Sequence, residues 1–171
     1  MEVNIIEVKK AKRGDAAAFA GLYQQIYADL YRFALYTLKN KNDAEDAVSE
    51  TVADAFASIG RLRKAEAFKG WIFRILYNKC KDKLKEYARK DEELPEDYKE
   101  AAANEKIEDS VVMRTLFFEL EEEERLIISM HLFAGYTSKE IGKLLKLNEN
   151  TVRSKESRAL KKLARQIEMR D

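Results

Sequence analysis

The chain has 171 residues, with 32 Lys or Arg, 31 Asp or Glu and one His, so its formal net charge is +1. Hydrophobic residues make up 46%, which excludes a disordered chain, and one Cys with one His excludes an internal disulfide and the usual zinc sites. No apolar run approaches the roughly 20 residues that span a bilayer, and the acidic N-terminus lacks a signal-peptide core, so a cytosolic protein is expected.

Three blocks of opposite charge divide the chain. Residues 1–90 have a net charge of +6, residues 91–124 of −11, and residues 125–171 of +6. This segregation indicates charged partners, nucleic acid among them. Six Gly and one Pro leave little material for hairpins, so we expect an all-α fold. The length suits one ordinary domain or two small ones.

Apolar residues at steps of three and four predict three helices in the first half of the chain. The first spans about residues 15–38, with Asp15 as its N-cap. The second begins near Asp43, where acidic side chains suit the positive end of the helix dipole, and ends at Gly60. The third spans about residues 68–90.

The second half predicts a linker followed by a helix-turn-helix. Residues 91–109 hold the only proline and many acids, and we interpret them as an acidic linker. Helical spacing returns over residues 111–120, and another helix is expected over residues 122–134. A capping box opens the next helix at Thr137. A tight turn with Leu147 buried then leads to a last helix capped by Asn148. Two short helices joined in this way, the second rich in Lys and Arg, indicate a DNA-binding helix-turn-helix.

The last helix is the first candidate site. Between residues 153 and 170 it carries seven Lys or Arg against two Glu, and polar side chains in its first turn can reach base edges. The start of the preceding helix offers backbone N–H groups to a phosphate. A solvated basic face is the plainer interpretation, but the capping box and the turn favour DNA binding. The residues expected to contact duplex DNA are Thr137, Ser138, Glu149, Asn150, Thr151, Arg153, Ser154, Lys155, Arg158 and Lys161.

Residues 61–90 form the second candidate site, with 11 basic residues against 3 acidic ones and aromatic residues between them. Cations that follow a phosphate backbone, together with rings that stack on unpaired bases, are what single-stranded nucleic acid binding requires. Equally, Trp71 and Phe73 can belong to the core while the lysines serve solubility. The residues alone leave both interpretations open.

An acidic segment from Asp43 to Glu50 is the third candidate. Its carboxylates suggest metal binding or acid–base catalysis at first, yet Asp43, Asp46 and Glu50 share one helix face and nothing else supplies a nucleophile or a cavity. A protein-docking patch is the sharper interpretation, and helix capping with surface charge is the plainer one. His131 and Cys80 are each single and lie in apolar helical segments, so we expect both to pack in the core.

Three segments, in the same order, resemble bacterial sigma factors of the extracytoplasmic-function group. Residues 43–50, DAEDAVSE, resemble the family segment DAED-x-x-Q-E, with Ser49 in place of Gln. Residues 68–79, FKGWIFRILYNK, resemble F-x-x-W-L-[YF]-x-I-A-x-N. Residues 136–154, beginning YTSKEIG and ending NTVRS, resemble [LM]-[ST]-x-x-E-I-A…G-T-V-K-S, with Asn150 where the family often has Gly. The resemblance covers about residues 12–168.

The resemblance implies two small helical domains, region two in residues 1–90 and region four in residues 110–171, joined by the acidic linker. Region two would dock on the clamp helices of the β′ subunit of core RNA polymerase and would melt and read the minus-ten promoter element. Region four would read the minus-thirty-five element as duplex. An anti-sigma factor, often at a membrane, is a further expected partner of a cytoplasmic protein. No enzyme activity, cofactor, metal or small-molecule substrate is expected.

Carried over to this sequence, the resemblance assigns residues to the two surfaces of region two. The polymerase-docking residues would be Asp43, Glu45, Asp46, Ser49 and Glu50. The residues on the melted minus-ten strand would be Arg61, Arg63, Lys64, Phe68, Trp71, Arg74, Asn78 and Lys79.

Three other functions compete with a promoter-specificity subunit. A helix-turn-helix regulator would bind duplex DNA, as a dimer, without being a polymerase subunit, but it needs neither the acidic helix nor the interleaved aromatics of residues 43–90. A helical protein-interaction module would make the charge segregation incidental. An enzyme would need a convergent acid, base, nucleophile or metal set, which the sequence does not offer.

Overall fold

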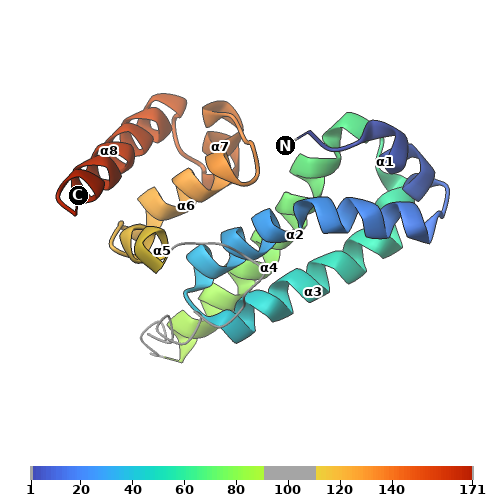
Figure 1. Ribbon diagram of the computed structural model, residues 1–171, viewed down its shortest axis with the longest axis horizontal. Coiled ribbons are helices and arrows are strands. Elements are labelled where there is room, and N and C mark those ends of the chain that lie inside the picture. The colour runs from blue at the N-terminus through green and yellow to red at the C-terminus, as the bar shows by residue number, and fades with distance from the viewer. Residues whose placement is uncertain (1, 91–110, 171) are drawn as a thin grey trace.

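A computed structural model describes residues 2–90 and 111–170, and all regular structure within these ranges is helical, as expected for the all-α class. Figure 1 shows two groups of helices side by side, the first drawn blue to green and the second yellow to red. The linker expected at residues 91–109 lies outside the described residues. The expected division into domains at 1–90 and 110–171 stays a prediction.

The first group opens with a helix that the periodicity did not predict. This helix, α1 (Ile5–Lys12), is capped by Asn4, whose side-chain oxygen accepts a hydrogen bond from a backbone N–H at 3.0 Å. It buries Val8, although its neighbours on the outer side are exposed. The long helix α2 (Ala16–Leu38) follows, and Asp15 caps it as expected.

Two more helices complete the first group. Helix α3 (Lys41–Ser58) begins slightly before the expected start, because the Asn40 side chain accepts a hydrogen bond from a first-turn N–H at 2.9 Å. Two short 3-10 turns, η1 (Ile59–Arg61) and η2 (Ala65–Ala67), then redirect the chain. They lead straight into α4 (Phe68–Arg89), which packs against α2 and α3.

Four helices form the second group. They are α5 (Val111–Phe118), α6 (Glu122–Leu132), α7 (Ser138–Leu145) and α8 (Glu149–Glu168). Gly135 has φ +71° between α6 and α7, a left-handed conformation that glycine adopts without steric cost. Within this group α8 packs on both α6 and α7.

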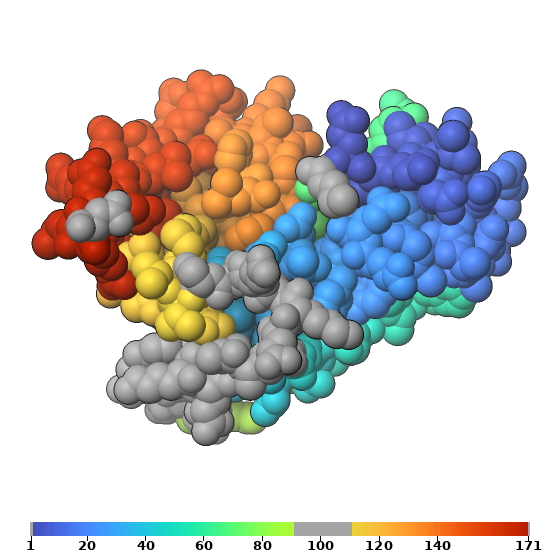
Figure 2. Space-filling view, viewed as in Figure 1, coloured from blue at the N-terminus to red at the C-terminus, as the bar shows by residue number. Residues whose placement is uncertain are grey.

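The C-terminal end of α2 joins the two groups. All residues from 33 to 38 are buried, so this end of the helix has no face turned to solvent. On one side the rings of Phe33 and Phe73 meet edge to face at 5.7 Å between centroids. On the other side the Tyr36 ring stacks on Phe117 at 4.7 Å. Figure 2 shows the orange atoms of the second group lying directly against the blue atoms of α2. The buried core is therefore continuous through both groups.

A buried arginine sits at this junction. Arg125 is 2% exposed; its Nε donates to the Tyr36 carbonyl at 2.8 Å and its Nη1 to the Leu120 carbonyl at 2.9 Å. The Tyr36 carbonyl belongs to the last turn of α2, where the helix dipole is negative. Burial lowers the pKa of the Arg125 guanidinium, and the nearby Glu122 opposes this effect. Arg125 thus connects the last turn of α2 with the turn between α5 and α6.

Replacing Arg125 by Met tests this junction. The change leaves the Tyr36 and Leu120 carbonyls buried without their donor, so the free energy of unfolding should fall by about 2–4 kcal/mol in urea denaturation. The matched control is Arg165→Met on the exposed side of α8, which should change the same quantity by less than about 0.5 kcal/mol. Equal stabilities of the two variants would contradict the bridging role.

Candidate nucleic-acid interface

The predicted helix-turn-helix is present in α7 and α8. Thr137 and Glu140 form the expected capping box, with the Glu140 N–H donating to Thr137 Oγ1 at 3.2 Å. The N–H of Leu147 donates to the Gly142 carbonyl at 2.9 Å and closes the turn, although Leu147 is half-buried rather than buried. Asn148 caps α8 as expected, accepting from a first-turn N–H at 2.8 Å. The turn and both caps therefore fix where α8 begins.

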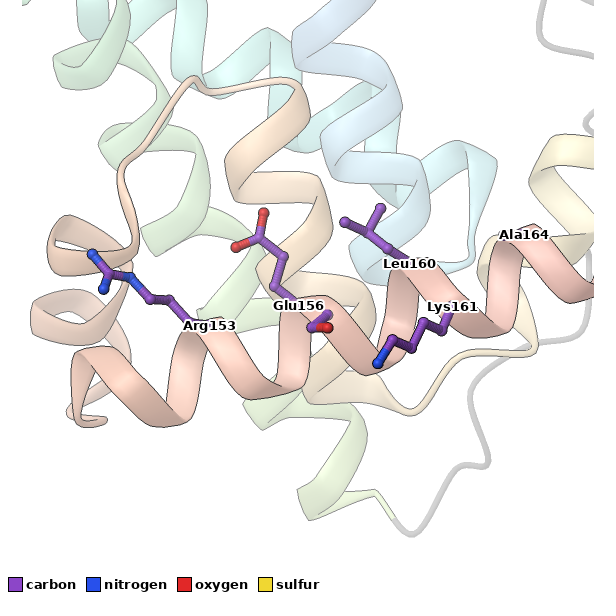
Figure 3. A pocket seen from close by; sticks show the side chains of 6 residues that line it. Arg153, Glu156, Leu160, Lys161 and Ala164 are labelled. Carbon is purple, nitrogen blue, oxygen red and sulfur yellow. The ribbon is translucent and has the colours of Figure 1, made fainter.

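The first turns of α8 face solvent. Val152 is fully buried and anchors this end of the helix on its inner side. The residues expected on duplex DNA divide into an exposed set, Thr137, Asn150, Thr151, Arg153, Ser154, Arg158 and Lys161, and a half-buried set, Ser138, Glu149 and Lys155. Figure 3 shows several side chains along successive turns of α8, where they line a shallow hollow of about 390 Å³.

Ion pairs hold α8 in place and occupy part of its basic surface. Arg153 pairs with Glu149 one turn away, at 2.5 Å between Nη2 and Oε1. Lys155 reaches Glu123 of α6 at 2.6 Å. Lys162 reaches Glu124 of α6 at 2.7 Å, and the Glu124 side chain is 3% exposed. The last two pairs position α8, whereas the Arg153 pair lies at the surface and is broken at small cost.

The basic surface of the first group surrounds a half-buried tryptophan. Arg61, Arg63, Lys64, Arg74 and Asn78 are exposed, and Trp71 is half-buried among them. These residues come from η1, from the loop after it and from the first turns of α4. Cations around an accessible ring are the arrangement that a single strand requires.

Phe68 does not belong to this surface. It is 1% exposed and shares the inner face of α4 with Ile72 and Leu76, which follow it at steps of four residues and are fully buried. The contact of Phe68 with the melted strand stays a prediction, and in this structure the side chain is buried. Its ring lies 6.1 Å from the Trp71 ring, so it supports the tryptophan from beneath.

Lys79 and Glu50, which were assigned to different partners, contact each other. The Lys79 Nζ lies 2.8 Å from Asp54 and 3.6 Å from Glu50 across α3 and α4. The hydrogen bond to Asp54 is the main reason that the pKa of Lys79 is raised, while desolvation opposes it. The ammonium group reaches a phosphate only after it leaves these carboxylates.

Some acidic side chains of α3 are exposed to solvent, and others make contacts within the protein. Asp46, Ser49 and Glu50 are exposed, whereas Asp43 and Glu45 are half-buried. The Tyr87 hydroxyl, near the end of α4, donates to the Asp43 carboxylate. Desolvation and this hydrogen bond raise the pKa of Tyr87. Among residues 2–90 and 111–170, no three His, Cys, Asp or Glu side chains are placed to hold a metal ion.

Cys80 and His131, which were both expected in the core, differ in burial. Cys80 is fully buried as expected, and burial raises the pKa of its thiol to about 12. His131 is not in the core: its side chain is 49% exposed, with Nδ1 at 3.2 Å from the Tyr136 carbonyl and Nε2 at 3.6 Å from Glu156. The expectation for His131 is wrong because α6 turns its other face, with Ile127 and Met130, toward the core.

A cleft separates the basic surface from α7. Its volume is about 970 Å³, and one wall is formed by residues 61–74 and the other by residues 134–144. The walls include Arg61, Arg63, Lys64, Lys69, Trp71 and Arg74 on the first side and Tyr136, Glu140, Lys143 and Leu144 on the second. No sequence pattern indicates that the two predicted DNA-binding regions face each other across a cleft.

No helix in the part of the chain that the structure describes is both long and apolar enough to cross a membrane.

Comparison with known proteins finds a family match in each half of the chain. The family model described as Sigma-70 region 2 matches residues 22–90, and the model described as Sigma-70, region 4 matches residues 116–165. The RNA polymerase sigma factor SigV of Bacillus subtilis is 30% identical over 146 residues, which cover 84% of this chain and 87% of SigV. The ECF RNA polymerase sigma factor SigM of Mycobacterium tuberculosis is 29% identical over 153 residues, 89% of this chain and 78% of SigM.

Two solved structures share the fold. CnrH in complex with the cytosolic domain of CnrY gives a TM-score of 0.65 at 21% identity, covering 99% of both chains. The sigma factor RpoE in complex with the anti-sigma factor NepR from Bartonella quintana gives a TM-score of 0.66 at 19% identity, covering 88% of this chain and 96% of RpoE.

The variant Phe68→Ala tests whether this side chain belongs to the core. Phe68→Ala should lower the free energy of unfolding by about 3–5 kcal/mol, because it empties a fully enclosed site. The control is Arg63→Ala, an exposed neighbour whose loss should cost less than about 0.5 kcal/mol. Chemical denaturation followed by circular dichroism measures both, and a Phe68→Ala protein as stable as the control would return Phe68 to the surface.

Proposed function

The chain belongs to the extracytoplasmic-function group of RNA polymerase sigma factors, and we propose that α3, α4 and the α7–α8 pair form its three working surfaces. As a member of this group it acts with core RNA polymerase at promoter DNA. The observation that carries the function is the match to both sigma regions, in order, within an alignment to SigV that covers 84% of the chain.

The docking surface for polymerase would be the exposed side of α3. Asp46, Ser49 and Glu50 present carboxylates and a hydroxyl to solvent, where a basic or polar partner helix can reach them. Asp43 serves this surface indirectly, because its bond with Tyr87 ties the start of α3 to the end of α4. We assign the clamp helices of the β′ subunit as the partner.

The melted minus-ten strand would bind the surface around Trp71. The exposed cations follow the phosphates, and the half-buried indole offers one face to a flipped or unstacked base. Asn78 lies about two turns after Trp71 on α4 and can read a base edge through its amide. Lys79 joins this surface once it leaves Asp54 and Glu50.

The duplex minus-thirty-five element would bind α8 in its major groove. Asn150, Thr151, Arg153 and Ser154 occupy the first exposed turns, from which a recognition helix contacts bases. Arg158 and the residues beyond it would contact phosphates. The Arg153–Glu149 pair keeps the guanidinium oriented before DNA arrives.

The wider assignment is a regulated subunit with no catalysis of its own. We propose that it works in the cytoplasm, where polymerase lies, and that an anti-sigma factor holds it inactive. RpoE, which shares its fold, was solved with the anti-sigma factor NepR. A net charge of +1 limits non-specific attraction of the free chain to DNA, because attraction and repulsion by phosphates largely offset.

Run-off transcription with sigma-free core polymerase tests the function. Adding the chain should produce promoter-specific transcripts from a genomic fragment library, whereas core polymerase alone should not. A chain that binds duplex DNA but never yields such transcripts is a plain helix-turn-helix regulator.

Two charge variants separate docking from DNA reading. Asp46→Arg should weaken binding to core polymerase about tenfold or more, since it places a cation on an acidic docking surface. Its control is Glu168→Arg at the far end of α8, which should bind core as the parent does.

Arg153→Ala should act on the other step. Holoenzyme affinity for the duplex element should fall about tenfold through the loss of one base-reading side chain, with core binding unchanged. Arg13→Ala, an exposed arginine just after α1 and outside the assigned surfaces, is the control. Equal loss of core binding in the Arg153 variant would contradict the assigned division of labour.

A further inference from the structure

The cleft between the two groups gathers cations from both of its walls. Six Lys or Arg side chains line it against two Glu side chains. Five of the cations come from the first group, and one comes from α7 of the second. Side chains of like charge thus converge from distant parts of the sequence. The six cations are Arg61, Arg63, Lys64, Lys69, Arg74 and Lys143.

These cations lack an acidic partner. None of the six forms an ion pair with a residue in the two ranges that the structure describes, whereas Lys79 and Lys155 each reach a carboxylate, at 2.8 and 2.6 Å. One acid of the cleft, Glu140, is already occupied, because its Oε2 accepts from the N–H of Thr137 at 2.8 Å and from the hydroxyl at 3.0 Å. Converging charges of one sign repel each other, and a bound anion removes this repulsion.

Tyr136 connects the two walls of the cleft. Its hydroxyl donates to the Gly70 carbonyl in the first turn of α4 at 2.5 Å, and the residue is 8% exposed. Burial raises the pKa of this hydroxyl to about 12, and the nearby charge of Arg74 opposes the rise. Arg74 on the first wall therefore lies close to Tyr136 on the second. A ligand in the cleft would contact both groups at once.

The size and the lining of the cleft suit a small aromatic anion. Its volume of about 970 Å³ lies within the range of about 300–1,000 Å³ that is typical of small-ligand sites. Trp71, half-buried in the first wall, offers a ring on which a planar base can stack. Lysine and arginine bind phosphate groups through charge-assisted hydrogen bonds. A stacking ring beside phosphate-binding cations is the chemistry that recognises a nucleotide.

We propose that the free chain binds a nucleoside polyphosphate in this cleft, with the base on Trp71 and the phosphates between Lys143 and the arginines of the first wall. The ligand occupies the surface assigned to the melted strand, so it competes with promoter DNA. This consequence rests on the proposed function, whereas the binding itself can be measured without it. Lys143 distinguishes the two uses of the surface, because it belongs to neither assigned DNA surface.

Fluorescence of the full chain measures this binding, because Trp71 is its only tryptophan. GTP or ATP should quench the Trp71 emission in a saturable way, with a Kd below about 1 mM. Isothermal titration calorimetry should show that guanosine, which lacks the phosphates, and tripolyphosphate, which lacks the base, each bind about tenfold more weakly than GTP. Quenching that does not saturate would overturn the site. Tripolyphosphate that binds as tightly as GTP would leave only a non-specific anion site and would also overturn it.

The variant Lys143→Gln tests whether both walls take part. Loss of this ammonium group should weaken GTP binding about fivefold, because the phosphates lose one charged contact. The matched control is Lys139→Gln, an exposed lysine of the same helix that does not line the cleft, which should bind GTP as the parent does. Both lysines are exposed, so both variants should fold normally. Run-off transcription by both should match that of the parent chain.

The outcomes decide separate questions. Equal GTP affinities of the two lysine variants would overturn a site that uses both walls. A Lys143→Gln protein that loses transcription but keeps its GTP affinity would assign this lysine to promoter DNA and would also overturn the site. Failure of the parent chain to direct promoter-specific transcripts would overturn the proposed function, while the GTP titrations would still decide whether the cleft binds a nucleotide.

Discussion

The end of α2 is the point on which the structure depends. Six consecutive residues there are buried, and no single helical group can cover a helix on every side. The second group supplies the missing cover through Phe117, and it also supplies Arg125, whose guanidinium donates to the Tyr36 carbonyl in the last turn of α2. One packing interaction and one buried cation therefore decide how two regions with separate tasks sit together.

Charged side chains on the proposed binding surfaces also form ion pairs within the chain. Lys79 neutralises Glu50 and Asp54, Arg153 neutralises Glu149, and Lys155 neutralises Glu123. A surface that is intended for phosphate or for polymerase is thus partly paired within the free chain. Exposed pairs contribute little to stability and yield readily to a stronger partner. Binding can then exchange internal contacts for external ones at low cost.

Local rules predicted much of the fold. The Asp15 cap, the Thr137 capping box and the Asn148 cap follow from side chains that act within one turn, and all three are present. Helix α1 was not predicted because its eight residues mix apolar and basic types without a clear apolar stripe. Its N-cap, Asn4, is the one local signal at its start. Short elements depend more on the neighbours they pack against than on their own periodicity.

The residue types of the candidate site could be predicted from the sequence, but the burial of individual side chains could not. Phe68 and Trp71 are both aromatic and both basic-flanked, yet a shift of three positions along α4 sends one into the core and leaves the other half-exposed. His131 shows the converse, since an apolar segment still turns one face to solvent. The cleft and the Tyr136–Gly70 bond join residues 66 positions apart, a distance that no local pattern reports.

The distance between the two groups in the free chain tests most directly the central claim that the second group packs on the end of α2. Dyes on Ala53→Cys in α3 and Ala164→Cys in α8 are both at exposed positions, and the buried Cys80 stays unlabelled. Single-molecule energy transfer should show one short distance in the free chain, compatible with a compact body of about 15 Å radius of gyration. A free chain that shows a long distance, or a broad range of distances, would contradict the account.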